Sequence, residues 1–87
     1  MNLLDLANDT ISGTLPNTIG NLKALTHLNL YYNEISGTLP ESLYTIYTLS
    51  FFRVSTNSFT GTISESIGNL INVTRLGFSW NSFTNLP

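Results

Sequence analysis

Apolar residues recur along the chain at a spacing of 24 residues. A first apolar column contains Leu4, Leu28, Phe52 and Leu76. A second column, two residues further on, contains Leu6, Leu30, Val54 and Phe78. A polar residue separates the two columns in the first three copies, and Gly77 does so in the fourth, so the pattern predicts short strands with one buried face. The register holds through three copies without an insertion, which indicates a chain built from structural repeats.

Each predicted strand is followed by the same set of turn residues. The polar column contains Asp9, Asn33, Asn57 and Asn81, and the glycine column contains Gly13, Gly37, Gly61 and, in the fourth place, Asn85. The letters SGTLP occur twice, at residues 12–16 and 36–40. Glycine permits a sharp reversal and proline stiffens the return. An asparagine amide that points inward both donates hydrogen bonds to loop backbone and accepts them.

One such unit cannot bury its own apolar stripe, so the units must stack. Stacked strands lie about 4.8 Å apart and share one continuous core. We therefore expect a right-handed coil made of one array over residues 1–87. Its units cover about residues 1–24, 25–48 and 49–72, with a partial unit at 73–87.

The combined pattern, LxxLxLxxNxISGxLPxxL, is complete in residues 25–43. It resembles the leucine-rich repeat, and its SGxLP part resembles the plant-type subclass. The resemblance covers the chain as about three and a half units. It implies a solenoid of the α/β class, mostly β here, with a short parallel concave sheet and a hydrogen-bonded ladder of Asp9, Asn33, Asn57 and Asn81. It also implies binding of other molecules, as in receptor-like ectodomains or enzyme inhibitors.

Three features depart from the repeat. Asp9 stands in the asparagine column, where an ionised carboxylate accepts but cannot donate, so we expect a weaker first rung. Ser64 replaces the proline of the third unit, and Asn85 replaces a glycine. The chain starts and stops within units, which favours a piece of a longer array over a chain that stands alone. Unsealed solenoid ends also favour self-association.

The residues that flank the buried pair of each strand define a candidate binding face. The candidate ligand-binding residues on this concave face are His27, Asn29, Tyr31, Tyr32, Phe51, Arg53, Arg75 and Trp80. Aromatic residues and arginine are enriched in binding hot spots. The alternative is structural, because exposed aromatics also stabilise a sheet through cross-strand pairs. The face measures only a few hundred Å², below the roughly 800 Å² per partner of a standard protein interface.

Composition excludes several other classes. The formal net charge is −2 and only 9% of residues are charged, which argues against a nucleic-acid partner. There is no cysteine, and no apolar run approaches the roughly 20 residues of a membrane span. We therefore expect no membrane contact by this segment. Localisation stays open: extracellular or cell-surface within a longer secreted parent, and cytoplasmic if the chain stands alone.

No catalytic or metal-binding pattern is present. His27 is the single histidine and has no HExxH-type spacing, and no GxSxG or glycine-rich phosphate loop occurs. We expect a non-catalytic protein without cofactor or metal. Asn8 and Asn72 begin N-x-Thr sequons, which are candidates for N-glycosylation only in a secreted protein.

The leading functional prediction is a module that binds a protein or peptide along the concave face, within a larger receptor-like protein. The alternatives are spacer repeats in a larger array and an inhibitor of a secreted hydrolase. A minor alternative is ice binding, because some ice-binding solenoids carry threonine arrays and Thr14, Thr38 and Thr62 recur in this chain.

Overall fold

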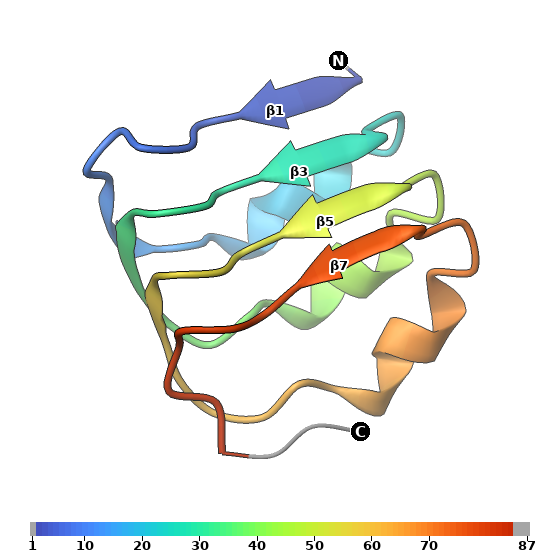
Figure 1. The fold of residues 1–87 in the computed structure, drawn as a ribbon. Coiled ribbons are helices and arrows are strands. Elements are labelled where there is room, and N and C mark those ends of the chain that lie inside the picture. The colour runs from blue at the N-terminus through green and yellow to red at the C-terminus, as the bar shows by residue number, and fades with distance from the viewer. Residues whose placement is uncertain (1, 85–87) are drawn as a thin grey trace.

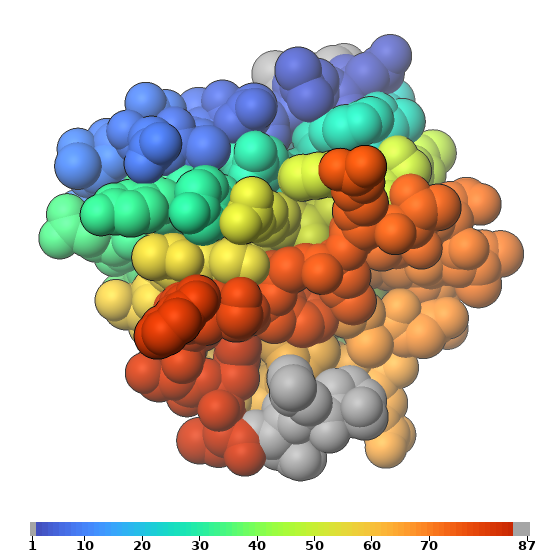
Figure 2. Space-filling view, in the orientation of Figure 1, coloured from blue at the N-terminus to red at the C-terminus, as the bar shows by residue number. Residues whose placement is uncertain are grey.

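A computed structural model describes residues 2–84. The expected fourth position of the glycine column, Asn85, lies outside the described residues. The chain winds into successive coils, each stacked on the one before (Figure 1). In the space-filling view the coils form bands that follow one another in chain order (Figure 2). The predicted solenoid of stacked units is confirmed.

The larger sheet has four parallel strands in the order β1-β3-β5-β7. The strands are β1 (Leu3–Asp5), β3 (His27–Asn29), β5 (Phe51–Arg53) and β7 (Arg75–Gly77). The middle residue of every strand faces the core: Leu28 and Phe52 are fully buried, and Leu4 pairs in register with Leu28. The residues of the first apolar column are therefore direct cross-strand neighbours in this sheet.

A second, smaller sheet follows the first turn of each coil. Its parallel strands, in the order β2-β4-β6, are β2 (Ser12–Thr14), β4 (Glu34–Gly37) and β6 (Ser58–Phe59). Gly37 and Gly61 have φ angles of 82° and 80°, in the region that favours glycine. At Gly61 a Cβ atom would stand 2.9 Å from the Thr38 methyl, so the turns also need glycine for space.

The return path of each coil contains a short 3₁₀ helix, which the sequence pattern did not predict. These helices are η1 (Asn17–Asn21), η2 (Glu41–Thr45) and η3 (Glu65–Asn69), and they lie on the side of the core opposite the larger sheet (Figure 1). Pro16 and Pro40 precede the first two helices in an extended conformation. Ser64, which replaces the third proline, caps η3 by accepting a hydrogen bond from the Ser66 amide.

Tyr44 belongs to η2, in the second coil, and lies close to Ser64 of the third coil. Its side chain is buried and its hydroxyl has no well-aligned hydrogen bond among residues 2–84. Burial raises the pKa of the Tyr44 phenol; the nearby backbone amide of Ser64 opposes this increase, and the charge of Glu41 adds to it. The neutral phenol is therefore the form that the fold favours.

Asparagine side chains join the coils beside the larger sheet. The Asn57 Nδ2 atom donates to the carbonyls of Leu30, in the preceding coil, and Val54, in its own coil, at 2.7 and 3.1 Å. Its Oδ1 atom accepts from the Ile35 amide at 3.1 Å. Asn33 and Asn81 make equivalent bonds one coil earlier and one coil later. Each amide thereby satisfies loop backbone in two coils at once.

Asp9 behaves differently from the asparagines of its column. Its side chain is exposed and makes no hydrogen bond within the described part of the chain. Its backbone N–H instead donates to Asn33 Oδ1 at 3.1 Å. The residue after it, Thr10, has a φ of 52°, whereas the equivalent residues Glu34 and Ser58 have negative φ angles. The backbone of the first turn therefore differs in conformation from that of the later turns.

Candidate functional site

The outward-pointing residues of the larger sheet form the candidate site, which we call the open face. It corresponds to the concave face of the sequence prediction. Strand register aligns its side chains in two rows across the strands. The first row is Leu3, His27, Phe51 and Arg75, and the second row is Asp5, Asn29, Arg53 and Gly77.

Aromatic and cationic side chains pack against one another across these rows. The rings of His27 and Phe51 stack with centroids 5.8 Å apart and an angle of 14° between their planes. The Arg53 guanidinium lies 3.8 Å from the centre of the Tyr31 ring, a cation–π contact. These contacts hold the centre of the open face in a defined arrangement. They also show that part of its aromatic content stabilises the sheet itself.

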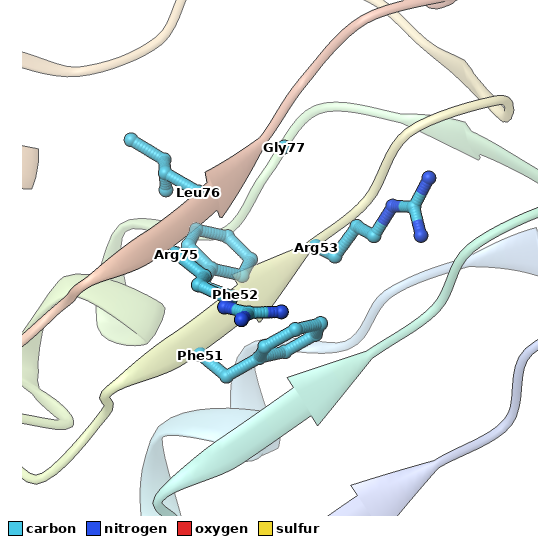
Figure 3. A pocket seen from close by; sticks show the side chains of 6 residues that line it. All are labelled: Phe51, Phe52, Arg53, Arg75, Leu76 and Gly77. Atoms are coloured by element: carbon cyan, nitrogen blue, oxygen red, sulfur yellow. The ribbon is translucent and has the colours of Figure 1, made fainter.

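A hollow of about 210 Å³ lies between β5 and β7. Its lining consists of Phe51, Phe52, Arg53, Arg75, Leu76 and Gly77 (Figure 3). The Arg75 side chain reaches from β7 toward Phe51, whereas the Arg53 guanidinium extends away from the hollow, toward β3 (Figure 3). The hollow therefore offers one guanidinium beside an aromatic ring.

Gly77 makes room for this arrangement. A Cβ atom at this position would stand 2.7 Å from Ser55 Oγ and 2.9 Å from Arg53 Cγ. The aliphatic part of Arg53 thus occupies space that any other residue would fill. The sequence prediction did not count Gly77 as a site residue, because a missing side chain carries no chemical group to recognise.

The arginines of the open face, Arg53 and Arg75, form no ion pair within residues 2–84. Asp5 shares a row with Arg53 but stands two strands away from it. Glu41 and Glu65 lie in the 3₁₀ helices, on the other side of the core. The open face around β5 and β7 is consequently cationic although the whole chain carries a formal charge of −2.

The remaining candidate residues lie outside the hollow. Tyr32 and Trp80 occupy equivalent turn positions after β3 and β7, with φ angles of 59°, and are 55% and 82% exposed. Trp80 borders a separate depression with Phe78 and Phe83. Asn29 is half-buried, and its Oδ1 atom accepts from the Tyr31 amide at 3.1 Å. The eight candidates thus form a central group on the strands and two exposed aromatic positions at their ends.

Both sequon asparagines are exposed. Asn8 occupies the same turn position as Tyr32 and has a φ of 61°. The Asn72 amide nitrogen, the atom that a glycan would modify, donates to the Tyr47 carbonyl at 2.9 Å.

Residues 2–84 contain no group of three or more potential metal ligands. In the same part of the chain, no helix has the length and apolar character needed to cross a membrane.

Solved structures of plant receptors resemble this chain closely. The plant peptide hormone receptor RGFR1, solved in complex with RGF2, matches with a TM-score of 0.93 and 32% identity over 95% of the chain. The leucine-rich-repeat ectodomain of the Arabidopsis receptor kinase HAESA, solved with an IDA peptide hormone, matches with a TM-score of 0.92 and 30% identity over 98% of the chain. The chain spans only 13% and 14% of the lengths of these two proteins.

A plant ice-binding protein also shares the fold. It matches with a TM-score of 0.80 over 95% of the chain and 26% of that protein, but at 24% identity this likeness concerns the fold alone. No significant match occurs among curated protein sequences.

The family model of the Leucine Rich Repeat matches residues 24–46 and 48–70, together more than half of the chain. These segments contain β3, β5 and the asparagine rungs between them. The stacked coils, the repeated register and this match agree, and the chain belongs to the leucine-rich repeat family.

Proposed function

We propose that this chain is a non-catalytic peptide-binding module and that its open face binds an extended peptide bearing a carboxylate. The observation that carries the proposal is the hollow between β5 and β7, where the Arg75 guanidinium lies beside Phe51 and has no acidic partner in the described part of the chain. A guanidinium forms strong, directional hydrogen bonds with a carboxylate. The Phe51 ring offers apolar contact to the neighbouring part of the peptide.

The size of the open face favours a peptide over a folded protein. Strands of three residues spaced about 4.8 Å apart present a surface of only a few hundred Å². A standard protein interface takes roughly 800 Å² from each partner. The described strands alone therefore offer less area than an inhibitor of a secreted hydrolase would use. The plant receptors RGFR1 and HAESA, solved with peptide hormones, support the same choice.

The test is selection of random-sequence peptides displayed against the folded chain, followed by fluorescence anisotropy with the selected peptides. We expect the selected peptides to share a carboxylate. We expect Arg75→Gln to weaken binding by about 10- to 100-fold, because the lost bonds join two charged groups. Lys23→Gln is the matched control: it removes the same charge near the 3₁₀ helices, where Lys23 Nζ donates to Thr45 Oγ1 at 2.6 Å.

Two outcomes would contradict the proposal. Selection that enriches no peptide would favour the alternative of spacer repeats within a larger array. Equal loss of binding in the Arg75→Gln and Lys23→Gln variants would show that net charge, and not the hollow, determines affinity. Circular dichroism of each variant establishes that the fold is unchanged before binding is compared.

Ice binding is the rival function, and the exposed threonines are the structural observation that bears on it. Thr14, Thr38 and Thr62 form an exposed column along the smaller sheet. The column is only one residue wide. The Thr14 and Thr38 methyl groups lie 3.1 and 2.9 Å from the points where a Cβ atom would stand on Gly37 and Gly61, so they face the next coil. We therefore expect no thermal hysteresis. Hysteresis that Thr38→Lys abolishes would make ice binding the better assignment.

A further inference from the structure

The Phe51 ring has a basic side chain on each side of it along the first row of the open face. His27, on β3, stacks against the ring with centroids 5.8 Å apart, and Arg75 reaches toward it from β7 (Figure 3). Both β3 and β5 pair with a strand on each side, so His27 and Phe51 lie inside the sheet. Arg75 always carries a positive charge, whereas a histidine carries one only when it is protonated.

The hydrogen bonds around His27 are compatible with a protonated ring. Its Nδ1 atom lies 3.0 Å from Thr26 Oγ1, and that hydroxyl lies 2.9 Å from the Asn2 carbonyl. Both nitrogens of an imidazolium donate, so the hydroxyl can accept from Nδ1 and donate its own hydrogen to the carbonyl. The exposed ring has no partner for its Nε2 atom within residues 2–84. Protonated His27 therefore presents one free N–H group, with its charge, on the open face.

The charged groups that face His27 come from its two neighbouring strands. On β1, Leu3 lies directly beside it and Asp5 lies one row away. On β5, Phe51 lies beside it and Arg53 lies one row away. His27 forms no ion pair in the described part of the chain. The positive charge of a protonated ring is therefore available to a ligand.

We propose that His27 is a second carboxylate-binding residue of the open face, and that the preferred peptide carries two carboxylates, one for Arg75 and one for protonated His27. This inference rests on the proposed binding of a peptide at the hollow. β3 and β7 are two strand spacings apart, about 9.6 Å, which an extended peptide spans in about three residues. The Phe51 ring offers apolar contact to the residues between the two carboxylates. Because histidine changes its charge between about pH 5 and 8, such a peptide binds more tightly in acid.

The test is isothermal titration calorimetry of the 87-residue chain at about pH 5.5 and about pH 8 with three hexapeptides blocked at both ends. The first probe has two glutamates three positions apart, with leucine and glycine between them. In each of the other two probes, one glutamate is replaced by glutamine. Glutamate carboxylates stay ionised at both pH values. We expect the two-glutamate probe to bind about 3- to 10-fold more tightly at the lower pH, a gain between those of an exposed ion pair and of a hydrogen bond to a charged group. The one-glutamate probes should gain less.

His27→Phe is the matched control variant. It keeps an aromatic ring against Phe51 and removes the titrating charge, so it should bind the two-glutamate probe equally at the two pH values. The N-terminal amine also titrates near pH 8 and is the same in both proteins. Circular dichroism at each pH establishes that the fold is unchanged.

Two results overturn the inference: a native chain that binds the two-glutamate probe no more tightly at the lower pH, and a His27→Phe variant that shows the same gain. In either case the proposed peptide binding stands if Arg75→Gln weakens binding of the probe. A probe that binds Arg75→Gln as tightly as the native chain would instead contradict the proposed function.

Discussion

The asparagine rungs predict that a carboxylate is worse than no side chain at all in the middle of the ladder. Asn57 serves three backbone groups: it donates to the Leu30 and Val54 carbonyls and accepts from the Ile35 amide. Asn57→Ala removes all three bonds. Asn57→Asp keeps the shape and the bond from Ile35, but places an oxygen where the amide nitrogen now lies 2.7 Å from the Leu30 carbonyl.

The partners that remain after each substitution determine its cost. The Leu30 carbonyl also accepts from Asn33, and the Val54 carbonyl also accepts from Asn81, so both keep one donor in either variant. Asn57→Ala thus leaves one buried N–H group, that of Ile35, without a partner, at a cost of about 1–3 kcal/mol. Asn57→Asp confines an unpaired charge against two carbonyl oxygens, which costs about 3–5 kcal/mol.

Urea denaturation followed by circular dichroism measures both changes. The native chain is expected to unfold with a free energy of about 4–13 kcal/mol, from the usual stability per residue, so Asn57→Asp removes a large share of it. Asn33→Asp and Asn81→Asp extend the comparison to the other rungs. If Asn57→Asp proves as stable as Asn57→Ala, the rungs act through their acceptor atoms.

Three further measurements probe the turns and the buried phenol. Gly61→Ala should lower stability by about 1–3 kcal/mol more than Gly13→Ala, since both glycines have positive φ but only Gly61 is crowded by Thr38; equal losses in thermal denaturation would show that backbone strain alone matters. Thr10→Asn should stabilise the chain by about 0.5–1 kcal/mol, because asparagine tolerates positive φ better than a β-branched residue; a lower melting temperature would argue against strain at Thr10. Burial raises the pKa of Tyr44 in the folded state, so its contribution to stability is complete below pH 10.0, the ordinary tyrosine pKa, and is lost as the pH rises toward the folded-state pKa. Tyr44→Phe should reduce this loss of stability at alkaline pH, and an unchanged dependence of unfolding free energy on pH would contradict the reasoning.

The sequence predicted the elements that repeat from coil to coil, because equivalent residues of successive coils lie directly beside one another. Leu28 lies over Leu4 and Phe52 over Leu28 because parallel strands of a stacked coil align identical positions. The same translation brings Asn33 and Asn57 to one shared carbonyl. A periodic sequence therefore predicts the strands, the turns and the rungs together.

The features that the sequence did not predict depend on contacts within one coil or on absent atoms. The 3₁₀ helices span five residues each, too few to establish a helical period. Tyr44 occupies the column of Gly20 and Gly68, and nothing in residue type alone indicates that one coil accepts a buried ring there. The Arg53 side chain packs where a Cβ atom of residue 77 would stand, and the residue types alone do not make this contact evident.

Each coil of the described chain contacts only the coils next to it, through strand on strand and helix on helix. The consequence is mechanical. Because no contact joins coils that are not neighbours, tension along the stacking axis can separate one junction between coils while the others stay intact. A pulled chain should lengthen in steps of single coils, while the remaining coils keep their folded shape.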